Sequence, residues 1–181
     1  AKAAQMMPLF FPGKDLSDRV LTVKENDTLS LGEHTLTFFM APMVHWPEVM
    51  VTYDKKDKVL FSADGFGKFG VIDADPDDWA CEARRYYFNI CGKYGAPVKA
   101  LLKKAAALEI EKVCSLHGPV LTAAELPEVL AAYDAWSAYR PEAEGVLVAY
   151  TSIYGHTAAA AEKLAAALQE KGKEVCVMDL A

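Results

Sequence analysis

Residues 146–180 carry a strand–loop–helix–strand pattern, which constrains the fold more than any other stretch of the chain. The run Val146–Tyr150 is apolar throughout and too short for most helices, as is typical of a buried strand in a parallel sheet. Apolar residues then recur at helical spacing, namely Ala161, Leu164, Ala165 and Leu168. Gly172 stands where a helix would be capped, and a second apolar run follows at 174–180. The pattern predicts a right-handed βαβ unit and an α/β fold.

Upstream of this unit the sequence shows two patterns, one typical of strands and one typical of helices. Between residues 20 and 64 short apolar runs alternate with turn formers, which predicts a β-meander. From about residue 76 to 137 the apolar residues recur at helical spacing. The predicted strands are VLTVK (20–24), HTLTFFMAPM (34–43), VMVTYD (49–54), KVLFSA (58–63) and KVCSL (112–116), and the predicted helices cover 75–95, 97–110 and 124–140. PEAEG at 141–145 is the best linker, so we expect two domains, residues 1–142 and 143–181.

Charge and composition exclude some classes of function. The net charge of -6 offers no basic surface for a phosphate backbone, so we expect no nucleic-acid partner. No apolar run approaches the roughly 20 residues that cross a bilayer, so we expect no membrane association and a cytoplasmic location. The cysteines 81, 91, 114 and 176 form no CxxC pair and lie in or beside apolar segments, which predicts reduced and buried thiols.

The loop TSIYGHT at 151–157 joins the first strand of the βαβ unit to its helix. Hydroxyl groups, free backbone N–H groups and the positive end of the helix dipole together make a phosphate site at such a position. Serine and threonine at a helix start are also common as plain caps, and the loop alone does not decide between the two.

Three polar residues each follow a predicted strand: His45, Asp64 and His117. Strand ends of one sheet edge can bring distant residues together, and imidazole and carboxylate are ligands that suit iron. Taken singly, each histidine is compatible with a hydrogen-bonded structural role and Asp64, before a glycine, with a turn. His34 is expected to face solvent. Glu48 is set aside as a ligand because Pro47 turns the chain beside it.

These segments resemble known families. TSIYGHT is similar to the FMN-phosphate loop of flavodoxins, with Thr151, Ser152, Ile153, Tyr154, Gly155, His156 and Thr157 in the matching places. Upstream, PMVHWPEVMVTY, KVLFSADGFG, YYFNI and SLHGPVL, in that order, resemble the flavodiiron proteins, or A-type flavoproteins. The resemblance covers the chain from about Val20 to Ala181.

The resemblance implies a fold, two cofactors and a set of roles. The fold would be part of a metallo-β-lactamase-like αββα sandwich, followed by the beginning of a flavodoxin-like doubly wound parallel sheet. His45 would bind one iron, His117 the other, and Asp64 would bridge the diiron pair. The implied function is an oxidoreductase that reduces O2 to water or NO to N2O, with electrons relayed through FMN from a rubredoxin-like or other small redox donor. A homodimer is implied for the full-length protein.

The resemblance also predicts what this segment lacks. The family's HxExDH-type ligand stretch lies upstream of the histidine that matches His45, and residues 1–44 contain none. Both ends of the chain look cut, so we expect a segment that by itself binds neither iron nor FMN well. Two other interpretations stay open: a metallo-β-lactamase-fold hydrolase, and a non-catalytic fragment of a larger assembly.

Overall fold

The computed structural model describes residues 2–70 and 79–181. The chain divides into two compact units, Ala1–Arg140 and Pro141–Ala181. In the described part of the chain no helix combines the length and the apolar character that a membrane span requires. The start of the predicted helix at 75–95 lies outside the described residues up to position 78.

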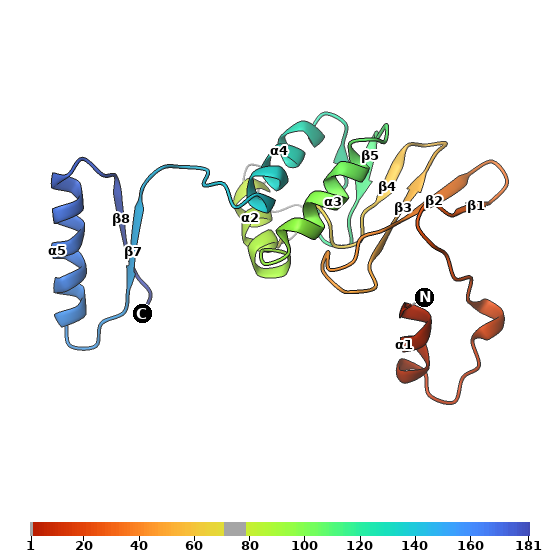
Figure 1. Ribbon diagram of the computed structural model, residues 1–181, viewed down its shortest axis with the longest axis horizontal. Helices are drawn as coiled ribbons and strands as arrows, with labels where there is room; N and C mark the ends of the chain where they lie inside the picture. Colours follow the sequence, from red (N-terminus) through yellow and green to blue (C-terminus); the bar gives the residue numbers. More distant parts are fainter. Residues whose placement is uncertain (1, 71–78) are drawn as a thin grey trace. The chain divides into compact units, whose positions relative to one another are not determined.

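The first unit is built on one mixed sheet of six strands in the order β1-β2-β3-β4-β5-β6 (Figure 1). The first four strands form an antiparallel meander, β5 pairs parallel to β4, and β6 pairs antiparallel to β5. The strands are β1 (Thr28–Ser30), β2 (Thr35–Met40), β3 (Met50–Asp54), β4 (Val59–Phe61), β5 (Lys112–Cys114) and β6 (Leu121–Thr122). Beside the sheet, the unit contains α1 (Lys2–Phe10), η1 (Ser17–Arg19), α2 (Trp79–Ile90), α3 (Gly95–Ala105) and α4 (Leu126–Ser137).

The predicted strand VLTVK at 20–24 is wrong, because these residues form no strand. The first strand lies after the turn instead, where Leu29 pairs with Leu36. The backbone of Asn26 takes a positive φ of 65°, and its N–H donates to the Phe38 carbonyl at 2.8 Å. This contact ties the turn to β2 and places only the short segment after it in the sheet.

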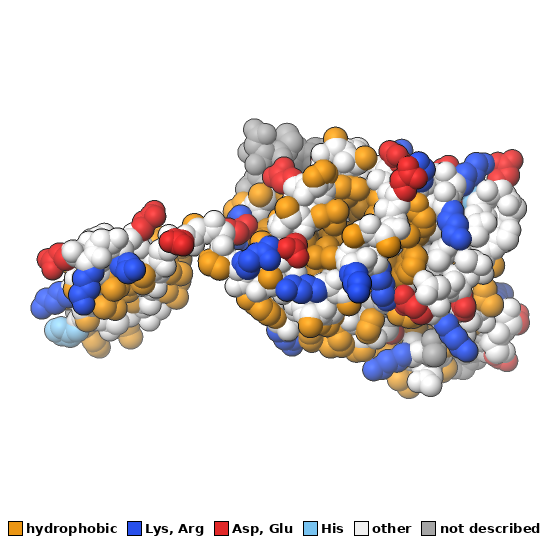
Figure 2. Space-filling view, turned by 45° about the horizontal axis from the view of Figure 1, so that its top comes forward, with side chains coloured by type: hydrophobic (Ala, Val, Ile, Leu, Met, Phe, Trp, Pro, Cys, Tyr) orange, Lys and Arg blue, Asp and Glu red, His pale blue; other side chains and the backbone are white. Residues whose placement is uncertain are grey.

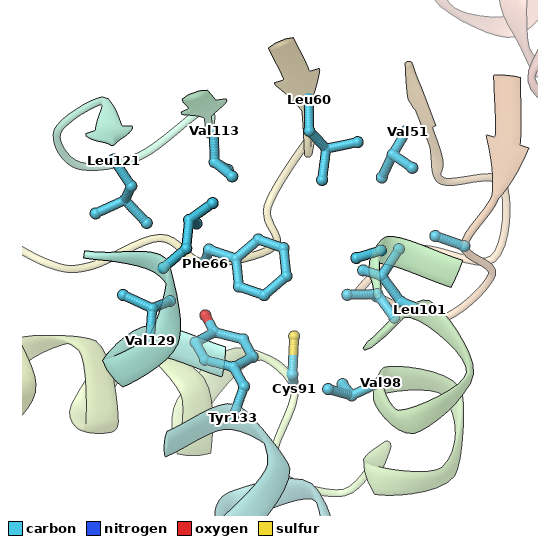
Figure 3. Packing of buried hydrophobic residues seen from close by; sticks show 14 of the residues in the cluster. Val51, Leu60, Phe66, Cys91, Val98, Leu101, Val113, Leu121, Val129 and Tyr133 are labelled. Carbon is cyan, nitrogen blue, oxygen red and sulfur yellow. The ribbon is translucent and has the colours of Figure 1, made fainter. Parts of the chain in front are cut away.

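Three helices cover one face of the sheet and close the core. Figure 3 shows Val51, Leu60, Val113 and Leu121 pointing from the strands toward side chains of α3 and α4. Phe66 sits between the layers, 4.9 Å from the Tyr133 ring centre. The helical side of the core includes Cys91, Val98, Leu101, Val129, Tyr133 and Trp136, all nearly excluded from solvent. This one sheet with its helical layer corresponds to half of the predicted αββα sandwich.

The second unit is a βαβ unit, as predicted. Its parts are β7 (Val146–Tyr150), α5 (His156–Glu170) and β8 (Val175–Asp179), with α5 alongside both strands (Figure 1). The strands are parallel, with Val146 opposite Val175 and Tyr150 opposite Asp179. The prediction that β7 is buried is wrong: its residues alternate between half-buried and exposed, and Leu147 is 60% exposed. One helix covers one face of the pair, and the other face of the described unit has no layer over it.

The cysteines are all free, but the prediction that they are buried holds only in part. Cys91 is buried and Cys114 is partly buried, whereas Cys81 and Cys176 are exposed. Cys176 lies on β8, most of whose residues are exposed. On the face shown in Figure 2, basic and acidic side chains are interspersed, and no single basic area stands out.

Candidate metal centre

The sheet brings the ends of three strands to one edge. Phe61 of β4 lies opposite Cys114 of the parallel strand β5. Asp64 and His117 each follow three residues after these partners, so both loops leave the sheet side by side. Because β2 and β4 are both antiparallel to β3, they run in the same direction, and the loop after β2 carries His45 to this same edge.

Asp64 lies between the two predicted histidine ligands. The Nε2 atom of His45 is 3.4 Å from Oδ2 of Asp64, and the Nε2 atom of His117 is 3.5 Å from Oδ1. Each imidazole therefore faces a different oxygen of one carboxylate. The Asp64 side chain is 11% exposed, against 30% for His45 and 59% for His117. The structure thus places the three residues in one group with the carboxylate in its centre.

Backbone contacts lock the Asp64 loop to the His117 loop. The N–H of Leu116 donates to the Ala63 carbonyl at 2.8 Å, and the N–H of Lys68 donates to the His117 carbonyl at 3.3 Å. Gly67 makes this close approach possible, since a Cβ there would lie 2.9 Å from the carbonyl oxygen of His117. The two loops therefore position Asp64 and His117 as one piece.

Tyr86 of α2 holds the Asp64 loop through a hydrogen bond. Its hydroxyl donates to the backbone carbonyl of Asp64 at 3.0 Å, and its ring centre lies 5.9 Å from that of His117. Burial, and then the nearby Asp64 carboxylate, raise the pKa of Tyr86 above its ordinary value. The phenol therefore keeps its proton and remains a hydrogen-bond donor at neutral pH. No pattern in the sequence indicates this role of Tyr86.

The His45 loop closes on itself before β3 begins. The N–H of Ala41 donates to the Val49 carbonyl at 2.9 Å, and the N–H of Met43 donates to the Trp46 carbonyl at 2.8 Å. The peptide bond between Val44 and His45 is cis. Val44 is 1% exposed and anchors the loop in the core, while Trp46 is 52% exposed. Because Val44 is anchored in the core and Trp46 lies at the surface, the orientation of His45 between them is set.

The donor set and its spacing fit a pair of bridged metal ions. The measured separations of 3.4 and 3.5 Å exceed the roughly 2.7–2.9 Å of a charge-assisted hydrogen bond. Two atoms that bind one ion at about 2.0–2.2 Å, at an angle of roughly 90–110°, lie about 2.8–3.6 Å apart. One imidazole on each side of a shared carboxylate is therefore compatible with one ion on each side. Buried carboxylates are normally paired or bound to metal.

The group opens into a cavity of about 570 Å³. Its apolar lining comes partly from α1, through Met6 and Phe10, and from the loops through Trp46, Val49, Met50, Ala63 and Leu116. The polar lining consists of His45, Asp64, His117 and Glu48. Sequence reasoning missed α1 altogether and set Glu48 aside. Phe66, two residues after Asp64, is a core residue at 2% exposure.

The sequence predicted that His34 faces solvent, but its side chain is held by a hydrogen-bonded contact with Asp54. Its Nδ1 lies 2.6 Å from Oδ2 of Asp54, and Asp57 completes a group whose ligand-type atoms all lie within 4.8 Å of one another. Burial alone would raise the pKa of Asp54, but the hydrogen bonds from His34 and from the Lys56 backbone lower it overall. This second group lies at the β2–β3 pairing and is separate from the three residues predicted as ligands.

The predicted phosphate loop lies at the start of α5. Ser152 Oγ accepts the N–H of Gly155 at 3.0 Å, and Gly155 takes the left-handed φ of 83° as the helix cap. Ile153 and Tyr154 are 90% and 87% exposed. The loop is thus a closed turn with exposed side chains at the N-terminus of a helix of 15 residues.

Comparisons with known proteins agree on one family. A family model described as "ODP family beta lactamase" matches residues 2–118. Diflavin flavoprotein A 1 of Synechocystis sp. is 34% identical over 88% of this chain, which spans 29% of that relative. The structure is similar to that of rubredoxin oxygen:oxidoreductase from Desulfovibrio gigas, with 28% identity and a TM-score of 0.88 over 99% of this chain. It is also similar to the flavodiiron protein from Giardia intestinalis, with 28% identity and a TM-score of 0.87 over 98% of this chain. The chain spans 46% and 44% of those two proteins.

Proposed function

Because this chain belongs to the ODP family of β-lactamase-like domains found in flavodiiron proteins, we propose that it is part of an oxidoreductase that reduces O2 to water, NO to N2O, or both. Electrons would reach a diiron site through FMN from a rubredoxin-like or other small redox donor. The full-length protein would be a cytoplasmic homodimer. The relatives named above are flavoproteins and flavodiiron proteins, which supports the class of chemistry.

The observation that carries this proposal is the position of Asp64 between two imidazoles. His45 would hold one iron through Nε2, His117 would hold the other through Nε2, and Asp64 would bridge them with its two oxygens. The iron pair, when bound, would supply the multi-electron redox chemistry, while the protein supplies geometry and electrostatics. The remaining iron ligands would come from the family's HxExDH-type stretch.

The residues that line the cavity determine which substrates suit it. Seven apolar or aromatic residues line the cavity beside the three ligands, and none of them would compete with the iron pair for a small neutral gas. They are Met6, Phe10, Trp46, Val49, Met50, Ala63 and Leu116. Tyr86 holds the Asp64 loop through its hydroxyl, so the carboxylate keeps its orientation when charge changes beside it. The cavity therefore suits diatomic substrates better than large polar ones.

We assign residues 151–157 as the loop that holds the FMN phosphate, in the flavodoxin-like start expected for 143–181. Thr151, Ser152 and Thr157 would donate hydroxyls, and the amides of the loop and of the α5 N-terminus would complete the cradle. Tyr154 and Ile153 project from this loop and are free to contact the flavin or a neighbouring chain segment. A flavin site of this kind would favour the reductase over a metallo-β-lactamase-fold hydrolase.

The test measures iron and FMN together. We expect the 181-residue chain to bind both weakly and its longer parent protein to bind both tightly, because ligand count and flavin stacking are incomplete in the segment. In the parent, Asp64→Ala should lose most of the iron and keep FMN, whereas the matched variant His34→Ala should keep both. Iron retained at wild-type level in Asp64→Ala would refute the assigned ligand set. Zinc-dependent hydrolysis with no bound flavin would favour the hydrolase.

A further inference from the structure

The proposed reaction needs protons inside the cavity. Reduction of O2 to two water molecules consumes four electrons and four protons, and reduction of two NO to N2O and water consumes two of each. His45, Asp64 and His117 are assigned as ligands, and the apolar lining carries no proton. Glu48 is the remaining titratable residue among those that line the cavity.

Glu48 lines the cavity without being fully buried. Its Oε2 atom is buried and has no hydrogen-bond partner among residues 2–70 and 79–181. The residue as a whole is only partly buried. The loop contacts on either side are fixed, because the N–H of Val49 donates to Trp46 at 3.2 Å and the Val49 carbonyl accepts from Ala41 at 2.9 Å.

An unpaired buried carboxylate oxygen costs free energy unless it carries a proton or meets a donor. Within the described part of the chain, nothing supplies a donor to Oε2. A proton on the carboxyl group avoids this cost, and Glu48 lines the cavity next to the apolar Val49 and Met50.

We propose that Glu48 is the proton-transfer residue of this site, an inference that rests on the proposed reductase function. The carboxylic acid of Glu48 gives its proton to an oxygen of the substrate as electrons arrive, so the Glu48 O–H bond breaks and a substrate O–H bond forms. The carboxylate left behind takes a new proton from solvent. Each turnover repeats this transfer until the protons counted above are delivered.

The experiment compares four forms of the iron- and FMN-loaded parent protein: wild type, Glu48→Gln, Glu48→Asp and the matched control Glu33→Gln. Glu33 is an exposed residue paired with Lys56. Glutamine keeps the shape but carries no transferable proton, so turnover should fall about 100-fold or more in Glu48→Gln. Glu48→Asp should retain more activity than Glu48→Gln, and Glu33→Gln should match wild type. Iron content, FMN content and the thermal transition should be equal in all four.

Two readouts separate proton transfer from a structural role. The solvent deuterium isotope effect on turnover should rise in Glu48→Gln, because proton delivery then limits the rate. Formate or acetate, small enough for a 570 Å³ cavity, should restore part of the turnover in Glu48→Ala. On the 181-residue chain alone, infrared difference spectra over an acid titration should lose one carboxylic acid band in Glu48→Gln and a different one in Glu33→Gln.

The outcomes are distinguishable. Full turnover in Glu48→Gln with unchanged isotope effect would overturn the role of Glu48 and leave the proposed reductase intact. A loss of iron in Glu48→Gln would overturn it too, because the residue would then act in building the site. A wild-type protein that holds iron and FMN but reduces neither gas would instead refute the proposed function.

Discussion

At the scale of single residues, Gly67 decides how closely two ligand loops can approach. A Cβ at this position would meet the His117 carbonyl oxygen and the Tyr86 ring, both at 2.9 Å. Gly67→Ala should therefore push the Asp64 loop off the His117 loop and lower the unfolding free energy by about 1–3 kcal/mol. Gly145→Ala is the control, since a Cβ there would lie 3.4 Å from the Glu174 carbonyl oxygen, an ordinary contact distance. Urea unfolding of both variants measures the difference, and equal stability would contradict the packing described.

Cys91 provides a prediction on pH at the same scale. Burial, and then the Asp64 carboxylate, raise the pKa of its thiol from 9.0 to about 12. A folded pKa above the unfolded one favours the folded state below pH 9.0, and this contribution is lost as the pH rises toward 12. In the native chain at pH 8, a thiol reagent should label the exposed Cys81 and Cys176 quickly and spare Cys91 until urea is added. Mass spectrometry of labelled peptides checks this, and early labelling of Cys91 would contradict it.

The three predicted ligands illustrate what sequence reasoning could reach at residue scale. His45, Asp64 and His117 stand at strand ends, and family resemblance selected them from the chain's other histidines and acids. The same reasoning missed Tyr86, and it considered Glu48 only as a ligand and set it aside. Tyr86 acts through a backbone carbonyl 22 positions away in sequence, and Glu48 acquires its meaning from a cavity that α1 helps to close. Both the Tyr86 hydrogen bond and the cavity beside Glu48 form only when the chain folds, so sequence patterns do not reveal them.

At the scale of elements, α5 is the layer that holds the second unit together. Ala161 and Ala165 are buried at 8% and 4%, whereas the neighbouring Ala166 is exposed. Ala165→Glu should place a charge against the β7–β8 pair and destabilise this unit by roughly 2–4 kcal/mol. Ala166→Glu should change stability by no more than about 0.5 kcal/mol, since glutamate is a good helix former. Hydrogen exchange of the β7 and β8 amides reports on the unit, and equal protection in the two variants would contradict this orientation.

Long and strongly patterned elements were predictable, and short ones were not. The strands β2 to β5 and the helices α2 to α5 follow from apolar periodicity and turn residues. The segment VLTVK has the right composition for a strand but lacks a partner, because the turn at Asn26 directs the next residues to β2. The helix α1 has no cap signal and includes Pro8, and β6 has only two residues. In these cases tertiary contacts decide, and propensity does not.

At the scale of the whole molecule, the predicted diiron ligands and the predicted FMN loop lie in different units. The three ligands and the cavity belong to Ala1–Arg140, and the predicted FMN loop belongs to Pro141–Ala181. The contact boundary, between Arg140 and Pro141, falls two residues before the boundary expected at 142/143, where the sequence PEAEG lacks periodicity. In the proposed reductase, electron transfer from FMN to iron would therefore depend on how the units meet in the full-length protein, within one chain or across a dimer.

Limited proteolysis tests this division. Residues 141–145 are all exposed and lie outside helices and strands, so a glutamyl endopeptidase should cut first after Glu142 or Glu144. Elsewhere in the chain, Glu109 pairs with Lys58, and Glu125 accepts hydrogen bonds from Thr122. The larger product should keep the thermal transition of the first unit, because its core is made within residues 38–136. Glu142→Gln with Glu144→Gln should slow this cut and leave the transition unchanged. A first cut within α2, α3 or α4, or loss of the transition after cleavage at the linker, would show that the first unit does not fold independently of the second.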